Sequence, residues 1–466
     1  MRHKLIISLV VSMFILVIAF GCATPQTQAP ATAVQTTEAD KSPIKIGIIA
    51  NQSSAVGKGA VASAEMAADE INAAGGVLGR RIEIITGDSQ MQVPHAVAEY
   101  KKLVMIDKVV AVIAAESTDL VAPMQDTGAD LFYEYPHICT CPGTSGIVLT
   151  DRVVDNYAKY KFFFRTFADP IARYLSGIGI AHDVVKKWGV KKVAILMDDL
   201  DWTKIYREGY PNPKTYAPSP YFAKLGDEVM KRDCSKGLPP QRDMWKAVGM
   251  EVVYEAKIAV NEKMFLPIFE SIASSGAEYI DGHALAYLDS VTMTKQWAES
   301  AAKDIPLHIS GGAIQMPGAW SATGGAILGL LLQMPSIEYE ITPMTIPYMR
   351  NILKKTGTGA TWMGQGSYDN VYLLSEAIKI AGGTKDIEKL IKTLETIETN
   401  ATTGKVKFEP KSHQAYMGYP YYTGPFAQWQ GEGNVKLLYP PEVVQKNNPG
   451  AQFIHPKELR EKAKTK

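Results

Sequence analysis

The sequence predicts an α/β fold with two lobes, each a parallel β-sheet flanked by helices. Short apolar runs rich in β-branched residues alternate with amphipathic segments along most of the chain, a pattern typical of parallel sheets covered by helices on both faces. A complete βαβ unit is recognisable at residues 44–88. The chain has 466 residues, which is too long for one hydrophobic core and favours two compact lobes.

The βαβ unit begins with the run IKIGIIA at residues 44–50, which has the length and composition of a buried strand. A helix is expected next, because apolar residues recur three and four positions apart. These residues are Val61, Ala64, Ala67, Ala68 and Ile71. Gly75 and Gly76 end the helix, since glycine readily adopts the left-handed conformation that closes helices. The alternating run RRIEIITGD at residues 80–88 is the second strand, so the helix crosses back over a parallel pair.

The same alternation continues through the following elements. Further strands are expected at residues 109–115, 135–141 and 276–284. Further helices are expected at residues 96–107, 118–130 and 290–303, and residues 182–199 are expected to hold a helix and then a strand. Parallel sheets of this kind bind ligands beyond the carboxyl ends of their strands, so candidate site residues are sought in those loops.

Residues 1–21 are predicted to be a secretory signal peptide. A short positive region opens the chain, an apolar run follows at residues 5–20, and the small-residue sequence AFGC closes the segment. The cysteine resembles that of a bacterial lipobox, so Cys22 is expected to be lipidated and to become the mature N-terminus. Ala19 stands where a leucine is usual. The alternatives are ordinary signal-peptidase cleavage and a retained anchor helix.

Residues 22–43 are predicted to be a flexible, lipid-anchored linker. The segment is rich in Ala, Thr, Pro and Gln and has no periodic apolar pattern, so it cannot bury enough surface to fold. No later stretch has the length and continuous apolarity of a membrane span. Export and lipidation together predict a location in the periplasm or on the outer face of the cell membrane.

Composition and motifs argue against nucleic-acid binding and against catalysis. The net charge is +1 and no basic cluster is interleaved with aromatic residues, so nucleic acid is not an expected partner. GKGA at residues 57–60 does not match a P-loop, GTSGI at residues 143–147 does not match GxSxG, and the histidines form no HExxH. Neither an enzymatic activity nor a cofactor is expected.

A series of fragments follows one order along nearly all of the mature chain. The fragments are residues 44–50, 64–90, 164–170 (FRTFADP), 190–199 (VKKVAILMDD), 366–382 (GSYDNVYLLSEAIKIAG), 403–410 (TGKVKFEP) and 426–443 (FAQWQGEGNVKLLYPPEV). Taken in this order, they resemble the periplasmic solute-binding proteins of branched-chain amino-acid-type ABC transporters, the leucine/isoleucine/valine-binding-protein-like family.

The resemblance implies the type I periplasmic-binding-protein fold, in which two α/β lobes joined by three hinge crossings close on a solute. Lobe 1 would comprise residues 44–166 and 311–411, and lobe 2 residues 167–310 and 412–466. The crossings would fall near Arg165-Thr166, Ser310-Gly311 and Glu409-Lys411. Residues 130–141 and residues 210–243 exceed the family pattern, and the second of these suggests an elaborated surface loop.

The resemblance places the solute's α-carboxylate at CPGTSGIVLT, residues 141–150. Gly143 and Ser145 fall on the contacting positions, with Thr144 between them. A glycine allows close approach, and a hydroxyl near a helix N-terminus donates to an anion. The alternative is that Thr144 or Ser145 merely caps the following helix.

A second loop, AESTD at residues 115–119, matches the other carboxylate-holding position of the family. Ser117 or Thr118 would donate to the ligand, and Glu116 stands where the family often has a serine. An acid in the cleft would favour a more cationic or hydrogen-bond-donating solute. The alternative is that Glu116 points away, into solvent or a salt bridge.

Two residues are expected to contribute from lobe 2. Trp202 aligns with an aromatic wall position, where it would close over the ligand or stack on a cation; its alternative is packing beneath the adjacent insertion. Asp289 falls on the acidic position that pairs with the ligand ammonium, and its alternative is to cap the helix that starts at Ser290. Tyr287 is expected to be part of the wall.

Three cysteines remain when Cys22 is lipidated. In an oxidising compartment one disulfide is expected, and we predict that Cys234 pairs with Cys139 or Cys141. His137, Cys139 and Cys141 alternate along an expected strand and so share one face. Such a face could bind zinc or copper, but it lacks a clear fourth ligand, so no metal site is expected.

The function implied by the resemblance is the extracytoplasmic substrate-binding component of an ABC transporter, which captures an amino acid or related small polar solute by hinge closure. Its partners would be the permease subunits and, through the lipid, the membrane. The alternatives are a ligand-sensing lipoprotein receptor that signals to a membrane partner, and an amide/urea-type or aromatic-compound-binding protein of the same family. An enzyme or envelope-assembly lipoprotein on this fold finds no support in a catalytic motif.

Overall fold

The computed structural model describes residues 41–168, 173, 185, 187–210, 239–333 and 338–465. The predicted signal peptide, Cys22, most of the linker and Cys234 lie outside these residues. All the described helices and strands belong to the unit Lys41–Lys466. None of the described helices is both long enough and apolar enough to cross a membrane.

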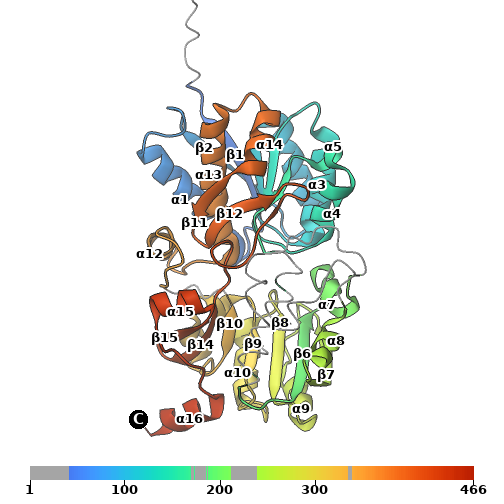
Figure 1. Cartoon of the computed structure of the whole chain (residues 1–466), viewed down its shortest axis with the longest axis vertical. Coiled ribbons are helices and arrows are strands. Elements are labelled where there is room, and N and C mark those ends of the chain that lie inside the picture. The colour runs from blue at the N-terminus through green and yellow to red at the C-terminus, as the bar shows by residue number, and fades with distance from the viewer. Residues whose placement is uncertain are drawn as a thin grey trace, which may run out of the picture. The chain divides into compact units, whose positions relative to one another are not determined.

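The first of two sheets has eight strands in the order β11-β12-β13-β5-β4-β3-β1-β2 (Figure 1). Strands β1 to β5 pair in parallel, β13 pairs in parallel with β5, and the β11–β12–β13 edge is antiparallel. The strands are β1 (Ile44–Ala50), β2 (Ile82–Asp88), β3 (Ala111–Ala114), β4 (Ile138–Cys141), β5 (Phe163–Arg165), β11 (Glu398–Ala401), β12 (Gly404–Glu409) and β13 (Gln414–Ala415).

Helices flank this sheet on both faces. The chain passes from β1 to β2 in one direction along the sheet and from β2 through β3 to β4 in the other. Right-handed crossovers therefore set α1 on one face and α2 and α3 on the other. The packing agrees, since α1 contacts α12 and α13, and α2 contacts α3. The helices are α1 (Ala55–Ala73), α2 (Val93–Lys101), α3 (Thr118–Leu131), α4 (Val148–Asp155), α5 (Tyr157–Tyr160), α12 (Thr345–Thr356), α13 (Trp362–Ala381) and α14 (Ile387–Thr396).

The glycine pair that ends α1 behaves as predicted. Gly75 has φ +100 and Gly76 has φ +76, in the region that favours glycine. A Cβ atom on Gly76 would lie 2.1 Å from the carbonyl oxygen of Arg80. Glycine is therefore required where the chain turns from the helix toward β2.

The second sheet has seven strands in the order β15-β14-β10-β9-β8-β6-β7. Strands β6 to β10 pair in parallel, and β14 and β15 complete the sheet as antiparallel strands. The strands are β6 (Lys192–Asp198), β7 (Glu251–Ile258), β8 (Tyr279–Ala284), β9 (Leu307–Ile309), β10 (Leu331–Gln333), β14 (Phe426–Gly431) and β15 (Asn434–Tyr439). Its helices are α7 (Lys204–Glu208), α8 (Gln241–Ala247), α9 (Leu266–Ser274), α10 (Ser290–Glu299), α11 (Ala319–Thr323), α15 (Pro441–Asn447) and α16 (Pro456–Lys464), with 3-10 turns η2 (Asp201–Thr203) and η4 (Ala313–Gln315).

The predicted fold class, two lobes each built on a largely parallel sheet flanked by helices, is confirmed. We call the first sheet with its helices and loops the first lobe, and the second sheet with its own the second lobe. Three connections join the two sheets, from β5 to β6, from β10 to β11 and from β13 to β14.

Two strands fall in a different sheet from the one that the predicted lobe boundaries assign to them. Strand β10 lies within residues 311–411 but pairs with β9 and β14 of the second sheet. Strand β13 lies after residue 411 but pairs with β5 of the first sheet, where the Arg165 guanidinium donates to the Gln414 side chain. The second and third crossings therefore come after these strands, rather than near Ser310-Gly311 and Glu409-Lys411. The remaining boundaries stay a prediction.

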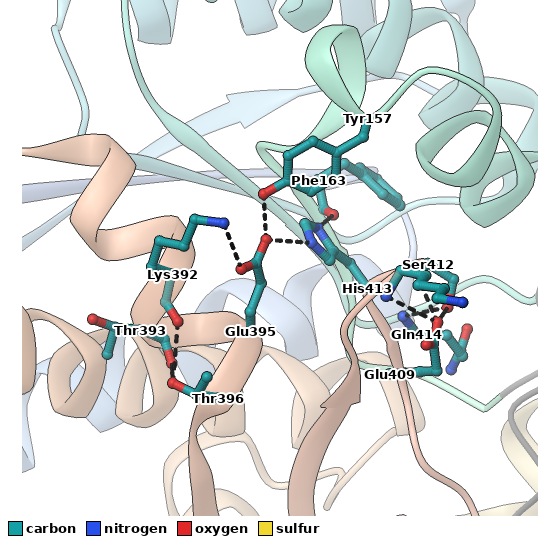
Figure 2. Close-up of polar contacts among 11 residues, drawn as sticks. Tyr157, Phe163, Lys392, Thr393, Glu395, Thr396, Glu409, Ser412, His413 and Gln414 are labelled. Atoms are coloured by element: carbon teal, nitrogen blue, oxygen red, sulfur yellow. Dashed lines mark hydrogen bonds and ion pairs between the residues drawn. The ribbon is translucent and has the colours of Figure 1, made fainter.

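A polar cluster anchors the chain just before the third crossing (Figure 2). His413 is fully buried and its ring stacks on Phe164 at 4.0 Å. Its Nδ1 lies 3.0 Å from the Phe163 carbonyl oxygen and its Nε2 lies 3.2 Å from Glu395 Oε1. The Tyr157 hydroxyl donates to the same Glu395 oxygen. Both His413 nitrogens therefore contact oxygen atoms of the first lobe, which holds the ring in place.

Candidate functional site

A small cavity lies beyond the carboxyl ends of strands from both sheets. Most of its residues follow β4 and β5 of the first sheet and β6, β8 and β9 of the second, the end of the strands at which open α/β sheets bind ligands. The lining residues are Gly143, Thr144, Ser145, Phe167, Arg173, Trp202, Ala286, Tyr287, Ser310, Gly311 and Trp362. Their side chains leave about 10 Å³ between them, room for about one water molecule.

The loop after β4 forms the first-lobe wall of the cavity. Gly143 packs so closely against α13 that a Cβ atom would lie 2.8 Å from Met363 Cε. The Thr144 and Thr118 hydroxyls share a hydrogen bond, which ties the loop to the start of α3. Ser145 is 3% exposed and its Oγ has no hydrogen-bond partner among the described residues.

The predicted residues Gly143, Thr144 and Ser145 thus all line the cavity. The alternative, a plain helix cap, does not hold, because α4 begins after Ile147 and no side chain caps it. An inward-facing hydroxyl without a partner is costly to bury. Ser145 is therefore suited to bind a polar group that enters the cavity.

Glu116 and Ser117 do not line the cavity, although both are buried in the first lobe. The Ser89 hydroxyl donates to Glu116 Oε1, and the backbone N–H groups of Ser117 and Asn51 also donate to the carboxylate. Burial raises the pKa of Glu116 to about 7 despite these bonds. Glu116 is therefore buried and hydrogen-bonded within the first lobe, and its effect on the choice of solute stays a prediction.

Aromatic residues form most of the second-lobe wall. Trp202, in η2, is 4% exposed and lies 6.2 Å from the Tyr287 ring, in the loop after β8. The backbone N–H groups of Ala286 and Tyr287 donate to Asp198 Oδ2 at 2.9 and 3.1 Å, which fixes this loop against the end of β6. Trp202 and Tyr287 both stand in the wall where they were expected, and the role of Trp202 in binding stays a prediction.

Arg173 supplies the positive charge of the cavity. Its guanidinium donates to Ser310 Oγ at 2.9 Å and lies 5.1 Å from the centroid of the Trp202 ring. The side chain is 6% exposed, so its field acts in a site that is largely shielded from water. Among the described residues that line the cavity, Arg173 is the only charged one.

Asp289 is not among the residues that line this cavity, and its predicted ammonium-binding role stays a prediction. Its Oδ1 accepts a bond from the Thr292 backbone N–H at 3.1 Å and so caps α10, the alternative considered from the sequence. Its Oδ2 accepts from Lys263 Nζ at 2.8 Å and from Thr292 Oγ1 at 2.9 Å. The carboxylate is held in place by helix capping and an ion pair at the protein surface.

Sequence reasoning missed Arg173 and Trp362. Arg173 follows the FRTFADP motif by three positions but belongs to no motif itself, and Trp362 precedes the motif that begins at Gly366. No local pattern distinguishes either residue from a surface arginine or a core tryptophan. Only the folded chain brings both to the same cavity.

Cys139 and Cys141 are free thiols in β4 and are fully buried. They are not bonded to each other, and pairing of either with Cys234 stays a prediction because Cys234 lies outside the described part of the chain. Both ring nitrogens of His137 contact protein groups, Nε2 the Tyr100 hydroxyl at 2.8 Å and Nδ1 the Tyr135 carbonyl at 2.6 Å. This histidine is therefore engaged in the core of the first lobe and not directed toward a metal ion.

Comparison with known proteins relates both the sequence and the fold to binding proteins. The sequence profile of the family described as "Periplasmic binding protein" matches residues 43–212 and 235–431. A relative described as "Amino acid binding protein" from Pseudomonas aeruginosa is 22% identical over 381 residues, which is 80% of this chain and 86% of the relative.

Two solved structures illustrate the likeness in fold. An ABC transporter substrate-binding protein from Sphaerobacter thermophilus has a TM-score of 0.63 and 20% identity, covering 85% of this chain and 97% of that one. A solute-binding protein of an ABC transporter from Rhodopseudomonas palustris BisB5, in complex with 3,4-dihydroxybenzoic acid, has a TM-score of 0.60 and 19% identity, covering 84% of this chain and 93% of that one.

Proposed function

The chain belongs to the periplasmic binding protein family, and from that premise we propose that it is the extracytoplasmic solute-binding component of an ABC transporter. The family and fold are those of substrate-binding proteins, not enzymes. The solute that we propose is a small organic carboxylate with a flat, apolar body. It would be held between the lobes by closure about the three connections.

The observation that carries this proposal is the composition of the cavity wall. Arg173 and Ser145 offer a guanidinium and a hydroxyl, while Trp202, Tyr287 and Trp362 offer aromatic faces. Guanidinium groups match the planar geometry of carboxylates, and aromatic walls favour flat apolar rings. A ring with one carboxylate uses both kinds of surface at once.

An amino acid is the second candidate, favoured by the loop Gly143–Ser145 and by the relative described as an amino acid binding protein. Its ammonium group would need an acidic partner, and Asp289 is occupied by Lys263 and the helix cap. The Rhodopseudomonas palustris protein holds an aromatic acid, and what favours that class for this chain is the aromatic wall of the cavity.

The family implies a location outside the cytoplasm. We propose in addition that Cys22 is lipidated and anchors the protein to the membrane, where permease subunits would be its partners. Labelling with palmitate should mark the wild type but not Cys22→Ser. Equal labelling of both would contradict the anchor without affecting the proposed solute.

A ligand screen by thermal shift tests the proposed solute class. We expect benzoate and 4-hydroxybenzoate to raise the melting temperature, and leucine, phenylalanine and putrescine to leave it unchanged. A ligand present at 100 times its Kd stabilises the folded state by about 2.7 kcal/mol. Stabilisation by leucine with none by the benzoates would replace the proposed class with the amino-acid alternative.

A further inference from the structure

Trp362 stands where the two lobes meet at the cavity. It begins α13, is 8% exposed, and lies 6.3 Å from the Tyr287 ring at an interplanar angle of 87°. Tyr287 in turn lies 6.2 Å from Trp202 at 65°. The three rings therefore form a continuous series across the cavity, with Trp362 from the first lobe and the other two from the second.

The backbone around Trp362 is fixed to the first lobe. Thr361 caps α13, with its Oγ1 accepting from the Gly364 N–H at 3.0 Å. Helix α13 packs closely on α1, so that a Cβ atom on Gly364 would lie 2.9 Å from Ser63 Oγ. Met363 contacts Gly143 of the opposite loop. Trp362 therefore moves with the first lobe, and lobe opening separates it from Tyr287.

The indole takes up space that a solute with a ring would need. The lining side chains leave about 10 Å³, whereas a six-membered ring occupies many times the volume of one water molecule. A ring can enter only after Trp362 and Tyr287 have separated. When the lobes close again, the bulk of the indole limits how large the enclosed ring system can be.

We propose that Trp362 determines the size of the solute, restricting the cavity to carboxylates with a single ring. This inference rests on the proposed function, because it specifies the solute class of the same site. Removing the indole should admit a two-ring carboxylate such as 2-naphthoate. Close packing makes the size limit strict, since extra atoms in a filled cavity force side chains or backbone to shift.

The test is calorimetric titration of the exported protein with benzoate and 2-naphthoate. We expect the wild type to bind benzoate at least about tenfold more tightly than 2-naphthoate. We expect Trp362→Ala to reverse this preference by a similar factor, and Trp362→Phe to fall between the two. Trp320→Ala is the matched control, because Trp320 packs against Trp429 and does not line the cavity.

The outcomes separate the inference from the function on which it rests. If the wild type binds benzoate and the Trp362 variants keep its size preference, the inference is overturned and the proposed function stands. If neither carboxylate binds the wild type or any variant, the proposed solute class is overturned and the inference falls with it. Trp362→Phe removes less volume than Trp362→Ala does. If Trp362→Ala does not fold, the same titrations of Trp362→Phe still test the inference.

Discussion

Single residues at the site differ in what the sequence could reveal about them. The loop Gly143–Ser145 and Trp202 follow strands whose positions can be predicted from apolar runs, so their place beyond the strand ends was predictable. Arg173 and Trp362 also line the cavity, but their segments come near it only once the two lobes are in place, which the sequence does not reveal. For Asp289 the local sequence could not separate a ligand-binding acid from a helix cap, because an acid before a helix serves equally well as a cap.

The Ser145 hydroxyl permits a prediction that separates binding from stability. Ser145→Ala removes a buried hydroxyl that has no partner among the described residues, so the unfolding free energy without solute should stay the same or rise. Binding of benzoate should weaken about five- to tenfold, the cost of one hydrogen bond. Ser367→Ala is the matched control, because its hydroxyl is also buried, has no partner in the described part of the chain and does not line the cavity. Equal binding by Ser145→Ala and wild type would exclude a contact between this hydroxyl and the solute.

Burial of Glu116 makes the free energy of unfolding decrease as pH rises. Burial raises its pKa to about 7 in the folded protein, above the unfolded value of about 4.3. The folded state therefore binds the proton more tightly, and this group lowers stability as pH rises from about 4 to 7. Glu116→Gln should be more stable than wild type by roughly 1–3 kcal/mol at pH 8 and not at pH 4.5. Denaturant midpoints measured at both pH values check this, and a pH-independent difference would contradict it.

At the scale of whole elements, periodicity predicted the alternation of strands and helices but left many individual elements out. The βαβ unit at residues 44–88 formed as expected, because its strands, helix and glycine turn each carry a local signal. Strand β10 was not predicted, since LLQ is too short for periodicity to distinguish strand from helix. Strand β13 has two residues and is fixed by the buried contact of Gln414 with Arg165. Because β10 and β13 were not predicted, the second and third hinge crossings were placed too early in the chain.

The cluster of Glu395, His413 and Tyr157 gives a prediction at this scale (Figure 2). Burial acts to raise the pKa of Glu395, but bonds from His413 and Tyr157 outweigh it and lower the pKa to about 2. The stabilisation is present above the unfolded pKa of about 4.3 and is lost as pH falls toward 2. Acid unfolding of Glu395→Gln should therefore depend less on pH between about 4 and 2 than that of wild type.

The control for this cluster is the variant Glu388→Gln. Glu388 lies on the same helix as Glu395, but its carboxylate pairs with Lys161 at the surface. Exposed pairs contribute little to stability, so this variant should keep the wild-type pH dependence. If acid unfolding of the two variants depends on pH to the same extent, the buried cluster does not stabilise the chain before the third crossing.

For the whole molecule, the central question is what holds the lobes together around the solute. Tyr210 follows α7 in the second lobe, and its hydroxyl donates to Asp151 Oδ2 on α4 in the first lobe. Nearby, the Trp362–Tyr287 contact also joins the two lobes. These contacts form only when the lobes are close, so they bear on the rate at which a bound solute is released.

Tyr210→Phe should therefore accelerate solute release. A hydrogen bond to a charged group is worth about 1.5–3 kcal/mol, so the dissociation rate should rise about tenfold or more. Tyr133→Phe is the control, because that exposed hydroxyl bonds only to Ala158 of its own lobe among the described residues. Stopped-flow measurement of benzoate release makes the comparison, and equal rates for both variants would show that the Tyr210 bond does not hold the closed state.

The central claim is that Arg173 binds the carboxylate of a small solute inside the cavity. Calorimetric titration of the wild type, Arg173→Gln and the surface control Arg350→Gln with benzoate tests it most directly. Truncating one partner of a buried, hydrogen-bonded charge pair costs about 2–5 kcal/mol. Arg173→Gln should thus bind about thirtyfold to several thousandfold more weakly, while Arg350→Gln, whose partner Glu338 lies at the surface, should bind like wild type. Unchanged benzoate affinity in Arg173→Gln, or tighter binding of leucine than of benzoate by the wild type, would contradict the account.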